Sequence, residues 1–183
     1  MMLDYEMKQN ADKVLHRSDS NLKPNNFDQK HVELMHQFVI NEYGGIHGIR
    51  DNKLLESVVI APYQSGFGQE FYPTIIDKAA KYLYDFSNYQ VFIDGNKRTG
   101  MITCSTLLRL NGFYLDMNSQ QQYCLTVDIA NHKLTYEDVV KILQDNILFK
   151  TNNQNIDNIN LDQFIDDYLK QYQENESLEI HDL

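Results

Sequence analysis

Hydrophobic side chains along most of this chain recur at intervals of three and four residues, the spacing that places them on one face of an α-helix. The first such run begins near Val32 and ends at a Tyr-Gly-Gly sequence at 43–45, where glycine can adopt the left-handed conformation that stops a helix. The second predicted helix begins after Asp51, a suitable N-cap, and ends at Pro62. Both helices are therefore bounded by residues that start or stop a helix through local chemistry.

The rest of the chain adds further predicted helices and little extended structure. The predicted elements are, in chain order, a loop around the Gly-Phe-Gly sequence at 66–68, a helix opened by Thr74, a helix from Thr99 that buries one face and stops at 111–112, a short extended piece at 113–115, a helix over 119–130, and a helix opened by Thr135 together with Asp138. No internal repeat is present, and no alternation of apolar and polar residues is sustained enough to form a sheet. The pattern predicts an all-α fold, a small helical bundle.

The two ends of the chain differ from its middle. Residues 1–26 are polar and are expected to form an N-terminal extension to a helical domain over 27–150. Residues 151–183 carry eight acidic residues against one lysine, a charge of −7 out of the net −10. Their apolar residues recur at helical spacing, namely Leu161, Phe164, Ile165, Tyr168, Leu169 and Tyr172. This extension is therefore predicted to be an acidic amphipathic helix that packs on the bundle or continues it.

Composition excludes several classes of protein. A net charge of −10 argues against broad, direct contact with nucleic acid, which requires basic surfaces. No segment approaches the apolar length of a membrane span, and the N-terminus lacks the basic start and apolar core of a signal peptide. Cys104 and Cys124 lack metal-ligand spacing and fall in apolar, helical segments. We therefore expect buried, reduced thiols and a cytoplasmic protein with no membrane contact.

The most informative segment is FIDGNKR at residues 92–98, the basic turn, which opens the helix that follows. Gly95 permits a sharp bend, and the free amides and dipole of a helix N-terminus favour anions. Lys97 and Arg98 add cationic donors, and Asn96 adds an amide donor. An Asp94 carboxylate could hold Mg²⁺ that bridges to phosphate oxygens. The turn is thus a candidate phosphate-binding site; taken alone, it is equally compatible with a common Asp-Gly turn and a solvated Lys-Arg pair.

Flanking segments decide between these two interpretations. They are YGGIHGIRD at 43–51, LLES at 54–57, YPT at 72–74 and KAA at 78–80, together with a match of residues 90–99 to the signature His-x-Phe-x-Asp-(Gly/Ala)-Asn-Lys-Arg-Thr. From His31 to about Lys150 the chain resembles the Fic/Doc family, particularly its Doc (death-on-curing) toxin branch. Lysine after the motif asparagine is typical of that branch, whereas AMP-transferring members usually have glycine there.

The resemblance implies a compact helical fold and a transferase that uses ATP, or another nucleoside triphosphate, with Mg²⁺ to modify a protein hydroxyl. Doc-like members transfer the terminal phosphate to a translation elongation factor and so stop protein synthesis, whereas other members transfer AMP. Such toxins usually pair with an antitoxin protein. The implied roles are metal binding by Asp94, an anion-binding turn lined by Gly95, Asn96 and Lys97, phosphate contact by Arg98, and anchoring of the loop by Phe92.

Gln90 departs from the signature, because the family has histidine at this position as the general base. A glutamine amide can orient a hydroxyl but has no basic lone pair with which to take its proton. The other histidines are distant in sequence, and none has a spacing that places it beside Asp94, so we expect surface or core roles for His16, His31, His36, His47, His132 and His181. The sequence therefore predicts a phosphate-binding site without its proton acceptor.

Three explanations of Gln90 stay open: an engineered inactivation, a natural pseudoenzyme, or a slow natural variant that relies on proton loss assisted by the substrate. We favour a catalytically impaired protein of toxin ancestry. The alternative function is a non-catalytic module that binds nucleotide or protein.

The acidic helix has an alternative role, in which it lies over the basic turn and masks the site. The inhibitory signature of such helices, Ser/Thr-x-x-x-Glu-Gly/Asn, is not satisfied, because Lys170 stands where a hydroxyl is required. Steric masking and partner binding stay open.

Overall fold

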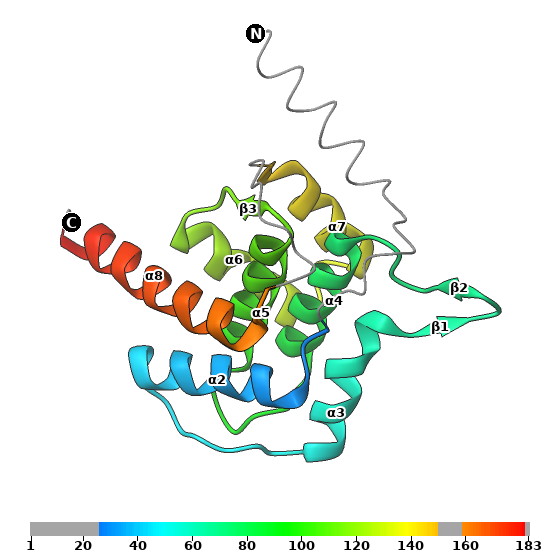
Figure 1. Cartoon of the computed structure of the whole chain (residues 1–183), viewed down its shortest axis with the longest axis horizontal. Helices are drawn as coiled ribbons and strands as arrows, with labels where there is room; N and C mark the ends of the chain where they lie inside the picture. Colours follow the sequence, from blue (N-terminus) through cyan, green and yellow to red (C-terminus); the bar gives the residue numbers. More distant parts are fainter. Residues whose placement is uncertain (1–25, 150–158, 182–183) are drawn as a thin grey trace, which may run out of the picture.

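Helix α5, Asn96–Leu110, runs through the middle of the computed structural model, which describes residues 26–149 and 159–181 (Figure 1). Twelve of its 15 residues are buried, so burial extends beyond the one face that the sequence pattern predicts. Its hydroxyl residues can be buried because they bond within the helix: Thr103 Oγ1 donates to the Thr99 carbonyl at 2.7 Å, and Thr106 Oγ1 donates to the Ile102 carbonyl at 2.7 Å. Satisfied polar groups of this kind allow a mixed sequence to form a central helix.

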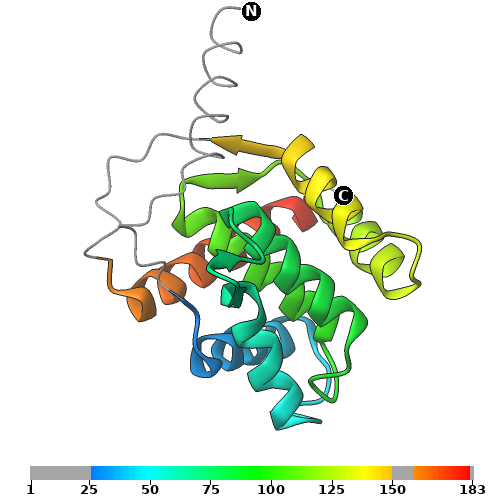
Figure 2. The same ribbon diagram turned by 90° about the vertical axis from the view of Figure 1, so that its right-hand side faces the viewer.

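The other helices surround α5. Helix α4, Ile75–Asn88, packs along it, and α2, Gln29–Tyr43, α6, Ser119–Ala130, and α8, Leu161–His181, also contact it. Helices α3, Asn52–Ile60, and α7, Tyr136–Asp145, pack against α4 (Figures 1 and 2). This arrangement confirms the predicted all-α architecture, with α5 as its buried centre.

The helix starts follow the predicted capping residues. The side chain of Asp51 accepts from the Leu54 N–H at 3.0 Å at the start of α3. Thr74 and Thr135 each form a capping box with an aspartate three residues later, at the starts of α4 and α7. Helix α3 ends at Ile60, and Pro62 lies in the 3₁₀ turn Ala61–Tyr63 that follows. Gly44 ends α2 with φ 75° and ψ 170°, which is not the left-handed stop predicted for it.

Short strands are the main addition to the predicted elements. The expected loop at 66–68 is a hairpin of β1, Ser65–Gly66, and β2, Gln69–Glu70. The predicted extended piece is β3, Phe113–Leu115, and it pairs antiparallel with β4, Ile147–Phe149. Strand β4 was not predicted, because its three apolar residues closely follow the apolar run of α7 and show no alternation of their own.

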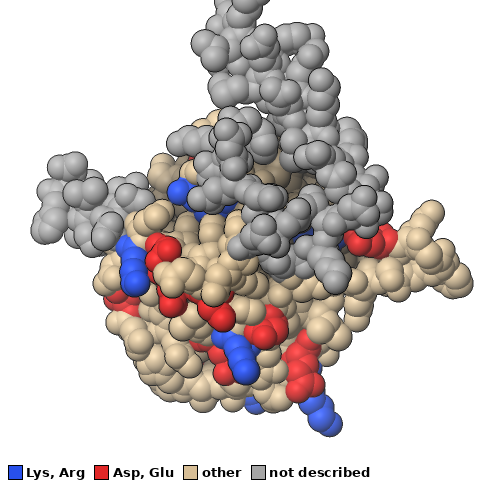
Figure 3. All heavy atoms as spheres, in the orientation of Figure 1, with Lys and Arg blue, Asp and Glu red and all other residues tan. Residues whose placement is uncertain are grey.

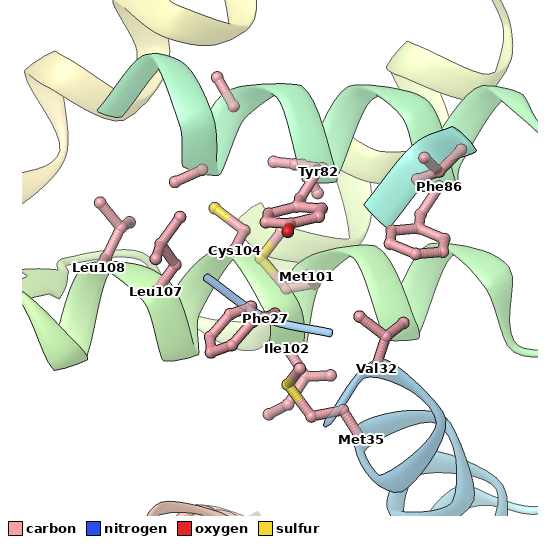
Figure 4. Packing of buried hydrophobic residues seen from close by; sticks show 14 of the residues in the cluster. Phe27, Val32, Met35, Tyr82, Phe86, Met101, Ile102, Cys104, Leu107 and Leu108 are labelled. Carbon is pink, nitrogen blue, oxygen red and sulfur yellow. The ribbon is translucent and has the colours of Figure 1, made fainter. Parts of the chain in front are cut away.

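The core lies where α2, α4 and α5 meet. Val32 and Met35 of α2 pack near Ile102 of α5, and Tyr82 and Phe86 of α4 lie on the other side of that helix (Figure 4). Cys104 is buried in this cluster as predicted, and burial raises the pKa of its thiol. Cys124 is exposed, so its predicted burial is wrong; it lies on the outer face of the short, surface helix α6.

Helix α8 packs on the bundle, as one of the two predictions for it stated. Ile165 and Leu169 are buried in the common core, and the helix contacts α2 and α5. Asp162, Asp166 and Asp167 are exposed, and the Asp162 carboxylate lies 3.1 Å from His31 Nε2 of α2. Residues 1–25 of the predicted N-terminal extension and 150–158 before α8 lie outside the described residues. Across the residues that are described, no helix combines the length and apolar character that a membrane crossing requires.

If α8 is an integral part of the fold, Leu169→Ala will lower the free energy of unfolding by roughly 2–5 kcal/mol, the cost of a cavity in a packed core. The matched control is Asp166→Ala on the exposed side of the same helix, for which we expect a change within about 0.5 kcal/mol. Urea denaturation of both variants measures these values. Equal losses in the two variants would contradict the packing of α8 described above.

Candidate active site

The basic turn lies at the N-terminus of α5, as the sequence predicted. Gly95 is the N-cap residue, with φ 74° and ψ 8°, a left-handed conformation that glycine adopts without strain. No side chain caps this helix in the described part of the chain. The first amide groups of α5 are therefore left for an acceptor from outside, in the position where the helix dipole also favours negative charge.

Two residues, Phe92 and Asn96, hold the basic turn in place against the core. The ring of Phe92 is fully buried between His36, with ring centroids 3.8 Å apart, and Phe86, with centroids 6.0 Å apart. The side chain of Asn96 bonds both backbone groups of Phe92: its Oδ1 accepts from the N–H at 2.8 Å, and its Nδ2 donates to the carbonyl at 2.9 Å. The turn is therefore closed by Asn96 and anchored by Phe92 before any ligand binds.

These hydrogen bonds limit which group of Asn96 is available to bind a phosphate. Its amide is engaged with Phe92 and lies 3.4 Å from Gln90 Oε1. The side chain thus shapes the turn, and the group that it leaves for an anion is the backbone N–H.

The two cations of the turn differ in their surroundings. Arg98 donates to the Gly44 carbonyl at 3.0 Å, lies over the Tyr43 ring at 5.9 Å, and is 3.9 Å from the Asp94 carboxylate. Lys97 is exposed. Arg98 is therefore held in place by α2 and the loop after it, whereas Lys97 can move to meet a ligand.

The surroundings of Asp94 fit a metal ion that is shared between the protein and a phosphate ligand. Its Oδ1 accepts from the Gly95 N–H at 2.6 Å, and the side chain is about half exposed, at 46%. A Cβ at Gly45 would lie 2.7 Å from Asp94 Oδ2, too close for any other residue, so the backbone of the loop packs closely against this carboxylate. Among the described residues no three His, Cys, Asp or Glu side chains gather to hold a metal by themselves. A single, half-exposed carboxylate on the cavity wall fits Mg²⁺, which usually takes its other ligands from water and substrate phosphates.

A cavity of about 550 Å³ begins at the basic turn. Residues in and beside the turn line it: Gln90, Asp94, Gly95, Asn96, Lys97 and Arg98. Neutral residues of α6 and α8 also line it: Ser119, Gln122, Tyr123, Thr126 and Tyr172. The volume is typical of small-molecule sites. The fold therefore brings all the predicted site residues to one cavity, and it adds neutral lining residues that the sequence did not indicate.

Gln90 is exposed and lines this cavity beside the turn. Its Oε1 lies 3.4 Å from Asn96 Nδ2, and the amide carries no group that takes a proton near neutral pH. Position 90, which the resemblance predicts to be that of the general base, thus lines the cavity and holds a neutral side chain.

His36 lies beneath the turn, which its distance in sequence did not reveal. Its Cε1 would be 3.5 Å from a Cβ at Gly95, and its ring stacks on Phe92. Thr99 Oγ1 donates to the Gly95 carbonyl at 3.0 Å, so it is assigned as acceptor from His36 Nδ1–H at 3.1 Å. His36 does not line the cavity, so it supports the turn from below and does not replace the missing base. The sequence signal that could have found it is spacing, because His36 lies four residues after Val32 and four before Ile40, on the buried face of α2.

Burial, together with nearby charges, keeps the imidazole of His36 neutral near pH 7. Burial lowers its pKa from 6.5 to about 4; the fields of His47 and Arg98 act in the same direction, and that of Asp94 opposes them. The unfolded chain therefore takes up a proton at this residue at a higher pH than the folded protein does.

Exposed apolar residues occur in the loop at 43–50 and in the segment 89–93: Tyr43, Ile46, Ile49, Tyr89 and Ile93. Of these, Tyr43 and Ile93 line the cavity. The loop at 44–50 runs antiparallel to residues 91–93, with the Ile93 N–H donating to the Gly48 carbonyl at 2.9 Å and the Arg50 N–H to the Val91 carbonyl at 2.8 Å. A concentration of apolar side chains beside a cavity is typical of a surface that meets another protein.

The state of His36 predicts a pH dependence of folding. Between pH 6.5 and about 4 the unfolded state binds the additional proton, so stability falls as the pH falls, by up to about 3 kcal/mol from this residue. Urea denaturation between pH 7.5 and 4.5 measures the slope. The matched variant His36→Asn does not titrate and keeps an amide donor for Thr99, so its slope will be smaller. Identical slopes for the two proteins would contradict a neutral, buried His36.

Comparison with known proteins agrees with this geometry. Residues 26–108, which span α2 to α5 and include the basic turn, match the model of the Fic/DOC family. The chain is 37% identical over 73 residues to "Toxin Doc" of Mycolicibacterium smegmatis (strain ATCC 700084 / mc(2)155), a match that covers 40% of this chain and 56% of that relative. It is 28% identical over 110 residues to "Protein kinase doc" of Escherichia phage P1, covering 60% of this chain and 86% of that relative. The chain thus spans little more than half the length of the first relative.

Proposed function

Because residues 26–108 form a domain of the Fic/DOC family, we propose that this protein is a Doc-like toxin that transfers phosphate, or AMP, from ATP to a protein hydroxyl. The substrate could also be another nucleoside triphosphate. The observation that carries the proposal is the uncapped N-terminus of α5, with Asp94, Lys97 and Arg98 on the wall of a 550 Å³ cavity. Gln90 is expected to leave this chain catalytically impaired.

Phosphate binding is supported by charge and by preorganisation. The free amides of α5 and two cations point to an anionic ligand, and the contacts of Phe92 and Asn96 fix the turn in advance. A preorganised turn loses little conformational entropy on binding, which favours affinity. Asp94 would hold Mg²⁺, and the metal would neutralise charge on the phosphates.

Phosphate transfer is favoured over AMP transfer by the basic turn and by the relatives. Lys97 follows the motif asparagine, as in the Doc branch, and the relative from Escherichia phage P1 is named a protein kinase. In this reaction the hydroxyl oxygen forms a bond to the terminal phosphorus, the bond to the bridging oxygen breaks, and the diphosphate leaves. The hydroxyl proton must then pass to a base or to solvent.

A protein target is supported by the exposed apolar residues of the paired segments 43–50 and 89–93, two of which, Tyr43 and Ile93, line the cavity. The proposal includes a host translation elongation factor as that target, an antitoxin partner, and a location in the cytoplasm. It includes no direct contact with nucleic acid, in keeping with the net charge of −10. On the face shown in Figure 3, the described surface mixes acidic and basic side chains and displays no broad basic area.

Gln90 supports a second candidate, a non-catalytic module that binds nucleotide or protein. Loss of a positioned general base costs roughly 10²- to 10⁴-fold in rate, whereas binding depends on groups that are present in this structure. The two candidates share the same cavity and differ only in whether a proton can leave the attacking hydroxyl.

Restoring the base tests the proposal. Gln90→His is expected to raise transfer of label from γ-labelled ATP to a protein of a translation extract by roughly 10²- to 10⁴-fold and to arrest growth on expression. α-Labelled ATP serves as the parallel measurement, because label from it is retained only after AMP transfer. The control is the double variant Gln90→His/Arg98→Ala, in which transfer should fall again because a phosphate contact is lost.

The outcomes separate the candidates. Label from γ-labelled ATP alone supports phosphate transfer, and label from α-labelled ATP supports AMP transfer. No label from either nucleotide, in a folded Gln90→His variant that still binds ATP, would overturn the enzymatic proposal in favour of the binding module.

A further inference from the structure

Helix α8 contributes to the cavity although it lies outside the residues that match the family model. The match ends at residue 108, within α5, whereas Tyr172 of α8 lines the cavity that begins at the basic turn. In Figure 1, α8 runs beside α2 and across α5, drawn in orange and red. The lining of the cavity is therefore formed in part by a segment that lies outside the matched residues.

Tyr172 is held in a fixed place. One and two turns before it, Leu169 and Ile165 are buried in the common core. The Tyr172 ring meets the edge of Phe38 of α2, with centroids 6.4 Å apart. The next residue, Gln173, donates through Nε2 to Glu42 Oε2 at 2.7 Å. Moving this part of α8 away would expose the apolar side chains of Ile165 and Leu169 to water, which costs free energy. The position of Tyr172 is therefore stabilised by the packing of its own helix.

The described part of α8 borders the cavity without filling it. About 550 Å³ is open with Tyr172 in place. The contacts of Arg98 are with Gly44, Tyr43 and Asp94, and none is with α8 among the described side chains. A helix that masked the turn would be expected to place a carboxylate against these cations. Here Asp166 and Asp167 of α8 are exposed.

The chemistry of the lining residues from α6 and α8 differs from that of the basic turn. Ser119, Gln122 and Tyr123 of α6 line the cavity together with Tyr172, and all four side chains are neutral. Aromatic rings with hydroxyl and amide groups are typical of surfaces that bind a base and a ribose, since a base stacks on a ring and its edge meets polar groups. The cavity thus combines cationic lining residues, suited to phosphates, with neutral and aromatic lining residues, suited to a nucleoside.

We propose that α8 completes the nucleotide site, with Tyr172 as the aromatic contact for the nucleoside part of the ligand. This inference rests on the proposed function, because it takes the ligand of the basic turn to be a nucleoside triphosphate. It assigns a binding role to the C-terminal helix, in contrast to the masking role that its acidic sequence alone leaves open.

Two ligands separate the two kinds of lining residue: ATP, which has a nucleoside, and inorganic triphosphate, which has none. Calorimetry with the full chain and Mg²⁺ is expected to show that Tyr172→Ala weakens ATP binding roughly tenfold, within the range for loss of one stacked base, and leaves triphosphate binding unchanged. Tyr172→Phe keeps the ring and should bind ATP nearly as the unaltered protein does. Arg98→Ala, in the basic turn, should weaken binding of both ligands. If Tyr172→Ala does not fold, Tyr172→Leu retains an apolar contact for Phe38 and removes the ring.

Each result has one meaning. Selective loss of ATP affinity in the Ala or Leu variant, with recovery in Tyr172→Phe, supports the inference. Unchanged or tighter ATP binding in those variants overturns it, and tighter binding would indicate masking by α8. Failure of the unaltered protein to bind either ligand would contradict the proposed function itself, and binding of triphosphate equal to that of ATP would overturn only the role of Tyr172.

Discussion

The site depends on how Phe92 and Asn96 are joined. Asn96 closes the backbone on both polar groups of Phe92, and the ring of Phe92 is fixed between His36 and Phe86. The basic turn is therefore attached to the core on its apolar side and to the start of α5 on its polar side. A turn fixed in this way presents free amides in a defined direction, which a flexible loop of the same sequence would not do.

Burial of α5 explains why so much of the structure bears on this one turn. Helices α2, α4, α6 and α8 all contact α5, and each one supplies residues near the turn or to the cavity beside it. His36 comes from α2, Phe86 from α4, Tyr123 from α6 and Tyr172 from α8. The same helices thus supply both core residues and residues of the site. A substitution in the core can therefore shift residues of the site without contacting a ligand.

In the proposed site, the residue at the position of the general base, Gln90, is separate from the groups that would bind phosphate. The amide at this position neither anchors the turn nor carries charge, and its one contact with Asn96 is long, at 3.4 Å. The groups expected to hold phosphate are in place independently of it. In the function that we propose, the site would therefore bind a nucleotide without a proton acceptor at position 90.

The sequence by itself determined what depends on near neighbours. Helix starts at Asp51, Thr74 and Thr135 follow from hydrogen bonds within three residues, and the basic turn follows from a glycine beside charged residues. Only the tertiary structure decided what depends on distant contacts: His36 beneath the turn, β4 beside β3, and Tyr172 on the cavity wall. These partners are separated by tens of residues, and no local pattern specifies which apolar faces meet. Their positions follow from the burial of α5, a property of the whole packed chain.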